Sequence, residues 1–121
     1  MSTEALVDDT FTDEHVGQTV EDGGQKPAAD GLESDAEGHI YSTAYEHNAI
    51  VRRRPDGMYE TLVFDPRVIW PDTLALAGDG YLYVINNQLN RQPRFHHGQD
   101  VRHRPYSLLR MRVDATPVRL Q

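Results

Sequence analysis

The 121-residue chain contains no cysteine, which excludes disulfide bonds, thiolate metal ligands and a cysteine nucleophile. It also lacks any apolar run close to the roughly 18 residues that a membrane-spanning helix requires, so we expect no membrane span. The opening MSTEALVDD lacks the basic and apolar stretches of a secretory signal peptide. Many exported proteins are also free of cysteine, so these absences leave the cellular location open.

Lysine is nearly absent: the chain has one, Lys26, and its other eleven basic residues are arginines. Residues 1–38 hold eleven acidic residues and that lysine, a net charge of −10, whereas residues 39–121 carry a net charge of +3. The arginines alternate along strand-like segments such as VRRR and LLRMRV, which indicates a solvated sheet face rather than a clustered phosphate-binding surface. We therefore expect no binding to nucleic acid.

Residues 1–27 form an acidic leader. Within it, Thr12 is suited to cap a short helix, with Asp13 and Glu14 favourable in the first turn. The following EDGGQKP would break any regular structure because it contains two glycines and a proline. A short helix and a flexible leader are both compatible with this segment.

The rest of the chain contains a repeat. The segment WPDTLALAGDGYLYVINN at 70–87 follows the pattern of AADGLESDAEGHIYSTAY at 28–45, and matched residues are 42 positions apart. The matched pairs are Asp30 and Asp72, Leu32 and Leu74, Gly38 and Gly80, and Tyr41 and Tyr83. Repeats of four short antiparallel strands with a period of about 40–45 residues are typical of β-propeller blades.

Apolar alternation and turn residues divide each repeat into strands. The predicted strands cover 31–34, 39–44, 49–54 and 59–64 in the first repeat, and 73–77, 81–86 and 106–113 in the second. A polar loop over 88–105 interrupts the second repeat. Only residues 116–121 could supply its fourth strand, and Pro117 permits an edge strand there at most.

The sequence thus predicts an all-β fold of about two four-stranded antiparallel blades of a β-propeller, preceded by the leader. The first blade covers residues 28–69, and the second, incomplete blade covers residues 70–121. A ring needs at least about four blades, so two blades form part of a propeller.

Three stretches resemble the C-terminal part of bacterial members of the major royal jelly protein/yellow family, which are relatives of the gluconolactonase-like six-bladed β-propellers. They are KPAADGLESDAEGHIYSTAYEHNAIVRR, YETLVFDPRVIWPDTLALAGDGYLYVINNQLNR and PYSLLRMRV, and the resemblance covers about residues 20–114. It implies that the chain is a C-terminal fragment of such a propeller, and that full-length relatives are often secreted. Thr73 departs from the family pattern, in which a glycine is more usual beside this aspartate.

Asp30 and Asp72 open the innermost strand of each repeat, and in a propeller those strands line the central channel. The resemblance implies that such an aspartate binds a divalent cation, Ca²⁺ or Zn²⁺, and that Asp72 acts as general base in lactone hydrolysis. Carboxylates suit this role, since Ca²⁺ takes about six to eight oxygen ligands. Aspartate also commonly orients the turn into a strand, and this structural interpretation stays open.

Three further residues are candidates for ligand binding. Asn86 and Asn87 end the second strand of the second repeat and could offer amide oxygens near the same channel mouth, with turn formation as the alternative. Trp70 precedes the inner strand of that repeat, and we expect it to pack between the blades; stacking on a sugar is the alternative.

Three histidines lie in the loop RFHHGQDVRHRP, at positions 96, 97 and 103. Zinc sites hold their ligands on rigid elements, and adjacent histidines in a loop flanked by glycine and proline do not provide this. We therefore expect a solvated loop rather than a metal site.

Two functions fit these residues. The first is a small-ligand-binding or interaction module without independent catalysis, whose partners are a small organic ligand and either other copies of the chain or the missing blades. The second is a gluconolactonase-like sugar-lactone hydrolase with a divalent cation at the channel mouth. We favour the first, because an enzyme needs three or more converging oxygen ligands.

Since two blades leave an apolar face uncovered, we expect the isolated chain to be marginally stable or to self-associate.

Overall fold

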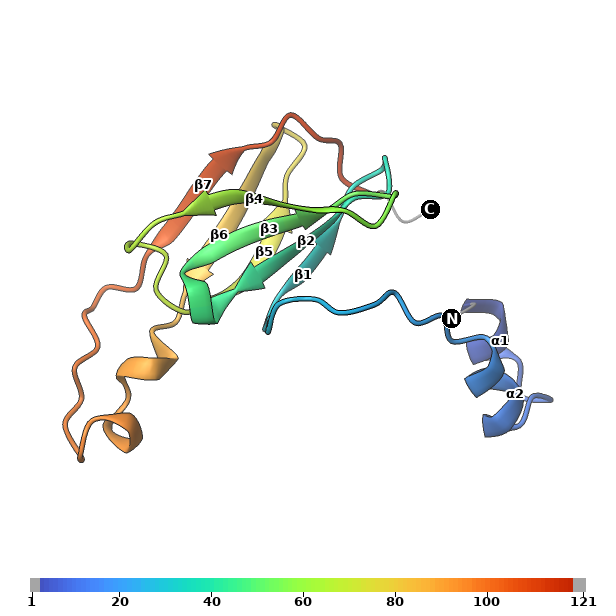
Figure 1. The fold of residues 1–121 in the computed structure, drawn as a ribbon, viewed down its shortest axis with the longest axis horizontal. Helices are drawn as coiled ribbons and strands as arrows, with labels where there is room; N and C mark the ends of the chain where they lie inside the picture. Colours follow the sequence, from blue (N-terminus) through green and yellow to red (C-terminus); the bar gives the residue numbers. More distant parts are fainter. Residues whose placement is uncertain (1–2, 119–121) are drawn as a thin grey trace.

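The computed structural model describes residues 3–118, and in it the chain is mostly β, with two antiparallel sheets of four and three strands (Figure 1). The first sheet has the order β1 (Leu32–Ser34), β2 (Ile40–Ala44), β3 (Ala49–Arg53) and β4 (Tyr59–Phe64). The second has the order β5 (Pro71–Leu76), β6 (Tyr81–Asn86) and β7 (Leu108–Arg112). The all-β prediction is confirmed, and the strands lie within two residues of the segments predicted from the sequence.

The two sheets begin with the same hairpin, as the repeat predicts. The β1–β2 turn contains Gly38 with φ 85°, and the β5–β6 turn contains Gly80 with φ 79°. Both angles lie in the left-handed region that glycine adopts without steric cost. The 42-residue spacing of these glycines therefore marks a repeated backbone turn.

The second sheet has three strands in the described part of the chain, and the predicted fourth strand does not form there. The segment expected to supply it returns instead to the first sheet, where Pro117 forms an isolated bridge with Asp35. The backbone N–H of Ala36 donates to the Thr116 carbonyl at 2.8 Å. Proline has no N–H to contribute to a sheet ladder, which suits this single bridge; residues 119–121 lie outside the described residues.

Neighbouring residues in a strand point to opposite faces, so the pairing registers define two faces for each sheet. We call the side that carries Tyr41, or its counterpart Tyr83, the forward face, and the opposite side the rear face. The forward face of the first sheet packs on the rear face of the second. The buried residues between the sheets are Tyr41, Ile50, Val68, Leu74, Leu76, Leu82 and Val84.

The packing is head to tail because each sheet uses a different face. It leaves the rear face of the first sheet and the forward face of the second without a sheet packed on them in residues 3–118. Large apolar side chains are exposed on both: Leu32, Tyr59 and Phe64 on the rear face, and Ile85 and Leu108 on the forward face.

The acidic leader is partly helical and lies apart from the sheets (Figure 1). It contains α1 (Thr3–Val7) and α2 (Asp13–Gln18). The Thr12 hydroxyl accepts a hydrogen bond from the His15 backbone N–H at 3.3 Å, which confirms Thr12 as the N-cap of α2. The segment from Val20 to Ala29 has no regular structure, as the two glycines and the proline indicated.

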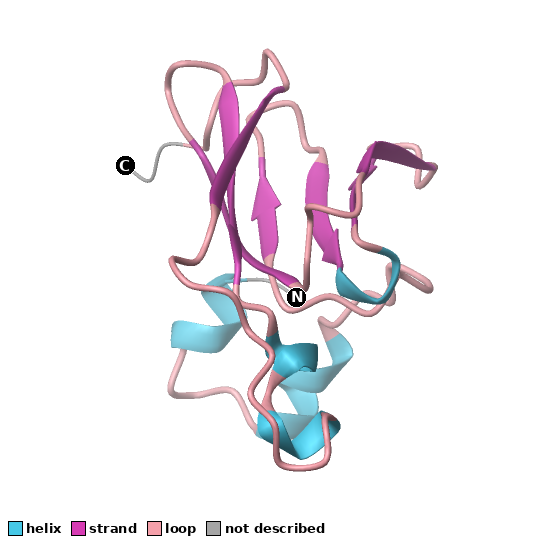
Figure 2. Cartoon of the chain, turned by 90° about the vertical axis from the view of Figure 1, so that its left-hand side faces the viewer, coloured by secondary structure: helices cyan, strands magenta, loops and turns pink. Residues whose placement is uncertain are grey.

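Three short 3₁₀ helices lie in the connections. The first, η1 (Tyr45–His47), joins β2 to β3, while η2 (Leu89–Arg91) and η3 (Pro93–Phe95) lie within the predicted polar loop. In the side view the strands occupy the upper part of the molecule and most helical turns the lower part (Figure 2). Over residues 3–118, no helix has the length and hydropathy needed to cross a bilayer.

Candidate functional site

The starts of β1 and β5 touch each other, and this contact brings the two repeats together at one end of the sheets. A Cβ atom built on Gly31 would lie 1.9 Å from the carbonyl oxygen of Asp72, much closer than any real contact. Only glycine fits this approach of two backbones. Asp30, which precedes Gly31, is therefore held close to Asp72.

Asp30 is fixed through its backbone and its carboxylate. The hydroxyl of buried Thr43 accepts hydrogen bonds from the backbone N–H groups of Asp30 and Gly31, at 3.1 and 2.9 Å. The exposed carboxylate of Asp30 accepts a hydrogen bond from the indole N–H of Trp70 at 2.7 Å. Asp30 thus links the first repeat to the residue that opens the second.

Trp70 forms an aromatic contact across the repeats. Its ring stacks on Tyr45, with centroids 4.3 Å apart and an interplanar angle of 15°. Its backbone has φ 48°, an unfavourable value for a bulky residue, and its carbonyl accepts a hydrogen bond from Asn87 at 3.2 Å. The half-buried Trp70 therefore packs between segments of the two repeats while forming part of the surface beside Asp30.

Asp72 pairs with Asn87. The Asn87 amide donates to the Asp72 carboxylate at 2.8 Å, and its oxygen accepts from the Leu89 backbone N–H at 2.8 Å. Both side chains are half-buried. Because the Asn87 oxygen accepts the Leu89 backbone N–H, the Asn87 side chain has a fixed orientation, and its NH₂ group in turn orients the Asp72 carboxylate.

Asn86, which the sequence grouped with Asn87, does not join this cluster in the structure. It follows the rear-face alternation of β6, so it points to the opposite face from Asn87. Its side chain is 1% exposed and donates to the Arg67 carbonyl at 2.7 Å. Its amide oxygen is buried and has no hydrogen-bond partner among the described residues.

The structure thus brings together Asp30, Trp70, Asp72 and Asn87 at one end of the sheets. Two carboxylates are fewer than the oxygen ligands of a Ca²⁺ site, so a cation here would need further ligands. Within residues 3–118, no group of three or more histidine, aspartate or glutamate side chains is placed to hold a metal ion. The arrangement offers two hydrogen-bond acceptors beside an aromatic pair, which are groups that can orient a small polar ligand.

The histidine-containing loop is held by Gln88, a residue that the sequence did not single out. Gln88 is 4% exposed; its amide donates to the His103 carbonyl at 2.8 Å and accepts from the His103 backbone N–H at 2.9 Å. His96 contacts the carbonyl of Asn90 at 3.0 Å, and His97 is exposed. The loop is thus largely solvated, as expected, but tied down at both ends.

Asp35 is a second residue that the sequence interpretation missed, because it treated the β1–β2 connection as a simple turn. Asp35 is 3% exposed and accepts hydrogen bonds from the Tyr41 hydroxyl at 2.8 Å and the His39 backbone at 2.9 Å; the His39 ring lies 2.9 Å away. Burial opposes ionisation, but the hydrogen bonds from His39 and Tyr41 outweigh it and lower the pKa of Asp35 below its ordinary 3.8. The sequence did contain one indication, because Tyr41 follows Asp35 by six residues and lies on the face of its strand that becomes buried.

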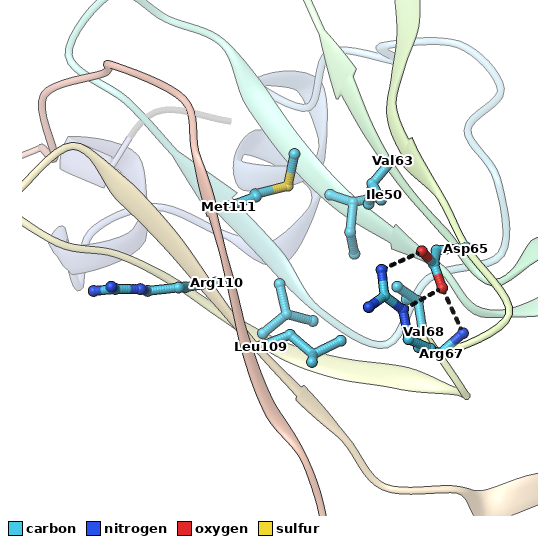
Figure 3. A pocket seen from close by; sticks show the side chains of 9 residues that line it. Ile50, Val63, Asp65, Arg67, Val68, Leu109, Arg110 and Met111 are labelled. Carbon is cyan, nitrogen blue, oxygen red and sulfur yellow. Dashed lines mark hydrogen bonds and ion pairs between the residues drawn. The ribbon is translucent and has the colours of Figure 1, made fainter.

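A cavity of about 220 Å³ lies between the sheets (Figure 3). Its lining includes Ile50, Val63 and Val68 from the first repeat and Val84, Leu109 and Met111 from the second. Asp65 and Arg67 form an ion pair of 2.7 Å beside it, and the hydrogen bonds from Arg67 lower the pKa of Asp65 to about 2. No sequence pattern indicates this cavity, since its walls come from strands far apart in the chain.

No protein-family model matches the chain, and the search of curated proteins gave no significant match. The fold and the geometry of these residues are therefore the basis for the functional proposals that follow.

Proposed function

We propose that the chain forms two consecutive blades of a β-propeller of the royal jelly/yellow type and acts as a binding and interaction module without catalysis of its own. The head-to-tail packing of the two sheets carries this proposal. Such packing is heterologous: each added sheet buries one face and presents another. A chain with two sheets therefore ends in two faces that further sheets can cover.

The rear face of the first sheet supports this interpretation most directly. Leu32 and Ile40 are 56% and 37% exposed, whereas their repeat counterparts Leu74 and Leu82 are 6% and 0% exposed because the first sheet covers them. The same positions are therefore apolar in both repeats but buried in one. Exposed apolar residues on a sheet face are typical of an interaction surface.

The partners proposed for these faces are further blades, supplied by other copies of the chain or by another polypeptide. A small organic ligand is the second proposed partner, at the end of the sheets where Asp30, Trp70 and Asp72 meet. The carboxylates would accept hydrogen bonds from ligand hydroxyl groups, and the half-buried indole of Trp70 would provide an apolar contact.

Sedimentation velocity of the purified chain tests the interaction module. We expect concentration-dependent association at micromolar concentrations, and we expect Leu32→Glu to weaken it because the substitution places a charge on the rear face. Leu6→Glu in α1 is a matched control, since Leu6 is 54% exposed but lies in the leader. A stable monomer with cooperative unfolding, or equal effects of both variants, would contradict the proposal.

The alternative function is a sugar-lactone hydrolase that uses a divalent cation, and the proximity of Asp30 and Asp72 favours it as a second candidate. Titration of Ca²⁺ or Zn²⁺ during a lactone-hydrolysis assay tests this function. If Asp72→Asn abolishes a cation-dependent activity while Asp56→Asn, a change in the exposed β3–β4 turn, leaves it intact, the chain is an enzyme. Absence of hydrolysis at any cation concentration is the result expected for the binding module.

A further inference from the structure

The second sheet is one strand narrower than the first, and β7 forms its open edge. Within residues 3–118, β7 pairs with β6 on one side and has no neighbouring strand on the other. An open edge presents unpaired backbone N–H and C=O groups and can pair with an extended segment of another chain.

The register shows which backbone groups face this edge. Asn86 donates its backbone N–H to Ser107, and Val113 donates to Gly80, at 3.1 and 3.0 Å. In an antiparallel pair the hydrogen-bonded positions alternate, so Leu109 and Met111 direct their backbone groups toward β6. The backbone groups of Leu108, Arg110 and Arg112 consequently point toward the open edge.

The cavity between the sheets lies along the same edge. Leu109 and Met111 form one wall, and Val63 of β4 faces them (Figure 3). Arg110 also lines the cavity although its side chain points away from it, so its backbone forms the border. At about 220 Å³ the cavity is smaller than the roughly 300–1,000 Å³ of typical small-molecule pockets. Its size suits one or two apolar side chains of an added strand.

Two arginines lie on the forward face of β7, opposite the cavity. Arg110 and Arg112 are exposed on the forward face, where Arg110 lies over the Tyr81 ring at 4.6 Å and Arg112 pairs with Asp114 at 2.6 Å. Residues directly opposite each other on neighbouring strands interact, and opposite charges are favourable there. A strand added beside β7 would therefore place acidic residues against these arginines.

We propose that the edge of β7 is a binding site for an extended, antiparallel segment of alternating acidic and apolar residues. The apolar side chains fill the cavity, and the acidic side chains face Arg110 and Arg112. The β7 strand of a second copy is a poor occupant, because antiparallel pairing about Arg110 would place two arginines opposite each other. The backbone edge of β7 is separate from the rear face of the first sheet, but Arg110 and Arg112 lie on the forward face that a further sheet would cover. Binding is therefore measured at a chain concentration below that at which sedimentation velocity detects association.

The experiment measures binding of a fluorescein-labelled peptide of alternating glutamate and leucine, slightly longer than the five residues of β7, to the full chain by fluorescence anisotropy. In antiparallel pairing, the glutamates lie opposite Leu108, Arg110 and Arg112, so their N–H groups point at β7. N-methylation of the glutamates should weaken binding by at least about tenfold, whereas N-methylation of the leucines should be tolerated. These two peptides have the same composition and form a matched pair.

Two protein variants complete the test. Arg110→Glu combined with Arg112→Glu should abolish binding of the acidic peptide and favour a lysine–leucine peptide. Arg110→Pro should weaken binding of the acidic peptide, because it removes an N–H that faces the open edge. Circular dichroism should show that the sheet stays folded, since this N–H does not bond to β6. No binding of the unmodified peptide, equal loss with both methylated peptides, or loss with Leu32→Glu in place of the β7 variants would overturn the proposal.

Discussion

Replacing Gly31 with alanine should separate the two sheets. Gly31 has φ outside the left-handed region, so alanine meets no backbone strain there, and the effect is steric. Its Cβ would lie 1.9 Å from the Asp72 carbonyl oxygen, against at least 3.4 Å for an ordinary contact, so the strands must move apart by about 1.5 Å. The Thr43 methyl group, 3.3 Å from the same point, blocks escape on another side.

The expected loss in the free energy of unfolding is about 3 kcal/mol, at the upper end of the range for overpacked cores, because the clash is with backbone rather than with a flexible side chain. For a folded region of this size, such a loss lowers the melting temperature by roughly 10–20 °C. Urea unfolding followed by the fluorescence of Trp70, the only tryptophan, measures it. Trp70 contacts Asp30 directly and therefore reports on this junction.

Gly78→Ala is the matched control. Gly78 lies in the β5–β6 turn, has φ outside the left-handed region, and would place its Cβ in open space. This substitution should leave stability unchanged or raise it by up to about 1 kcal/mol, because alanine restricts the unfolded chain. If Gly31→Ala is as stable as Gly78→Ala, the sheets do not meet at Asp72, and the placement of Asp30 beside it is wrong.

Three other substitutions test the described contacts. Asp35→Asn should reduce stability near neutral pH. Because the folded pKa of Asp35 lies below 3.8, the ionised carboxylate stabilises the fold above that pH and this stabilisation is lost in more acidic solution. Urea unfolding curves of the variant and the wild type should therefore converge at acidic pH. Gln88→Ala should release the loop at His103 and speed its cleavage by trypsin while the circular dichroism of the sheets stays unchanged. Trp70→Phe should cost about 1 kcal/mol in urea unfolding, since it removes the N–H bonded to Asp30 but keeps the stacking on Tyr45; an unchanged midpoint would contradict this contact.

The strands could be predicted because their signals are local. Alternation of side chains, turn glycines and the N-cap threonine depend on residues a few positions apart, and all of them appear in the structure. The repeat added one longer-range signal: Gly38 and Gly80 occupy the same position in the two repeats, which implied that both repeats begin with the same hairpin. The pairs Asp30 with Trp70 and Asp72 with Asn87 could not be read in this way, because each depends on how two elements meet.

Asn86 shows the limit of the local signal. The sequence placed it with Asn87 at the end of one strand, but the pleat turns neighbouring side chains to opposite faces, and only packing of the first sheet determines which face is buried. Pro117 shows a similar limit: its sequence position suggested the second sheet, whereas the tertiary structure places it beside Asp35 in the first.

The segments that extend, the turns between them and their repetition follow from local signals in the sequence, because backbone preferences and side-chain alternation act over neighbouring residues. Three features emerge only when the chain is folded: which faces of the two sheets meet, which carboxylates lie together at one end, and where a cavity is left beside an open strand. These features depend on contacts between residues far apart in the chain, whose geometry no local preference specifies.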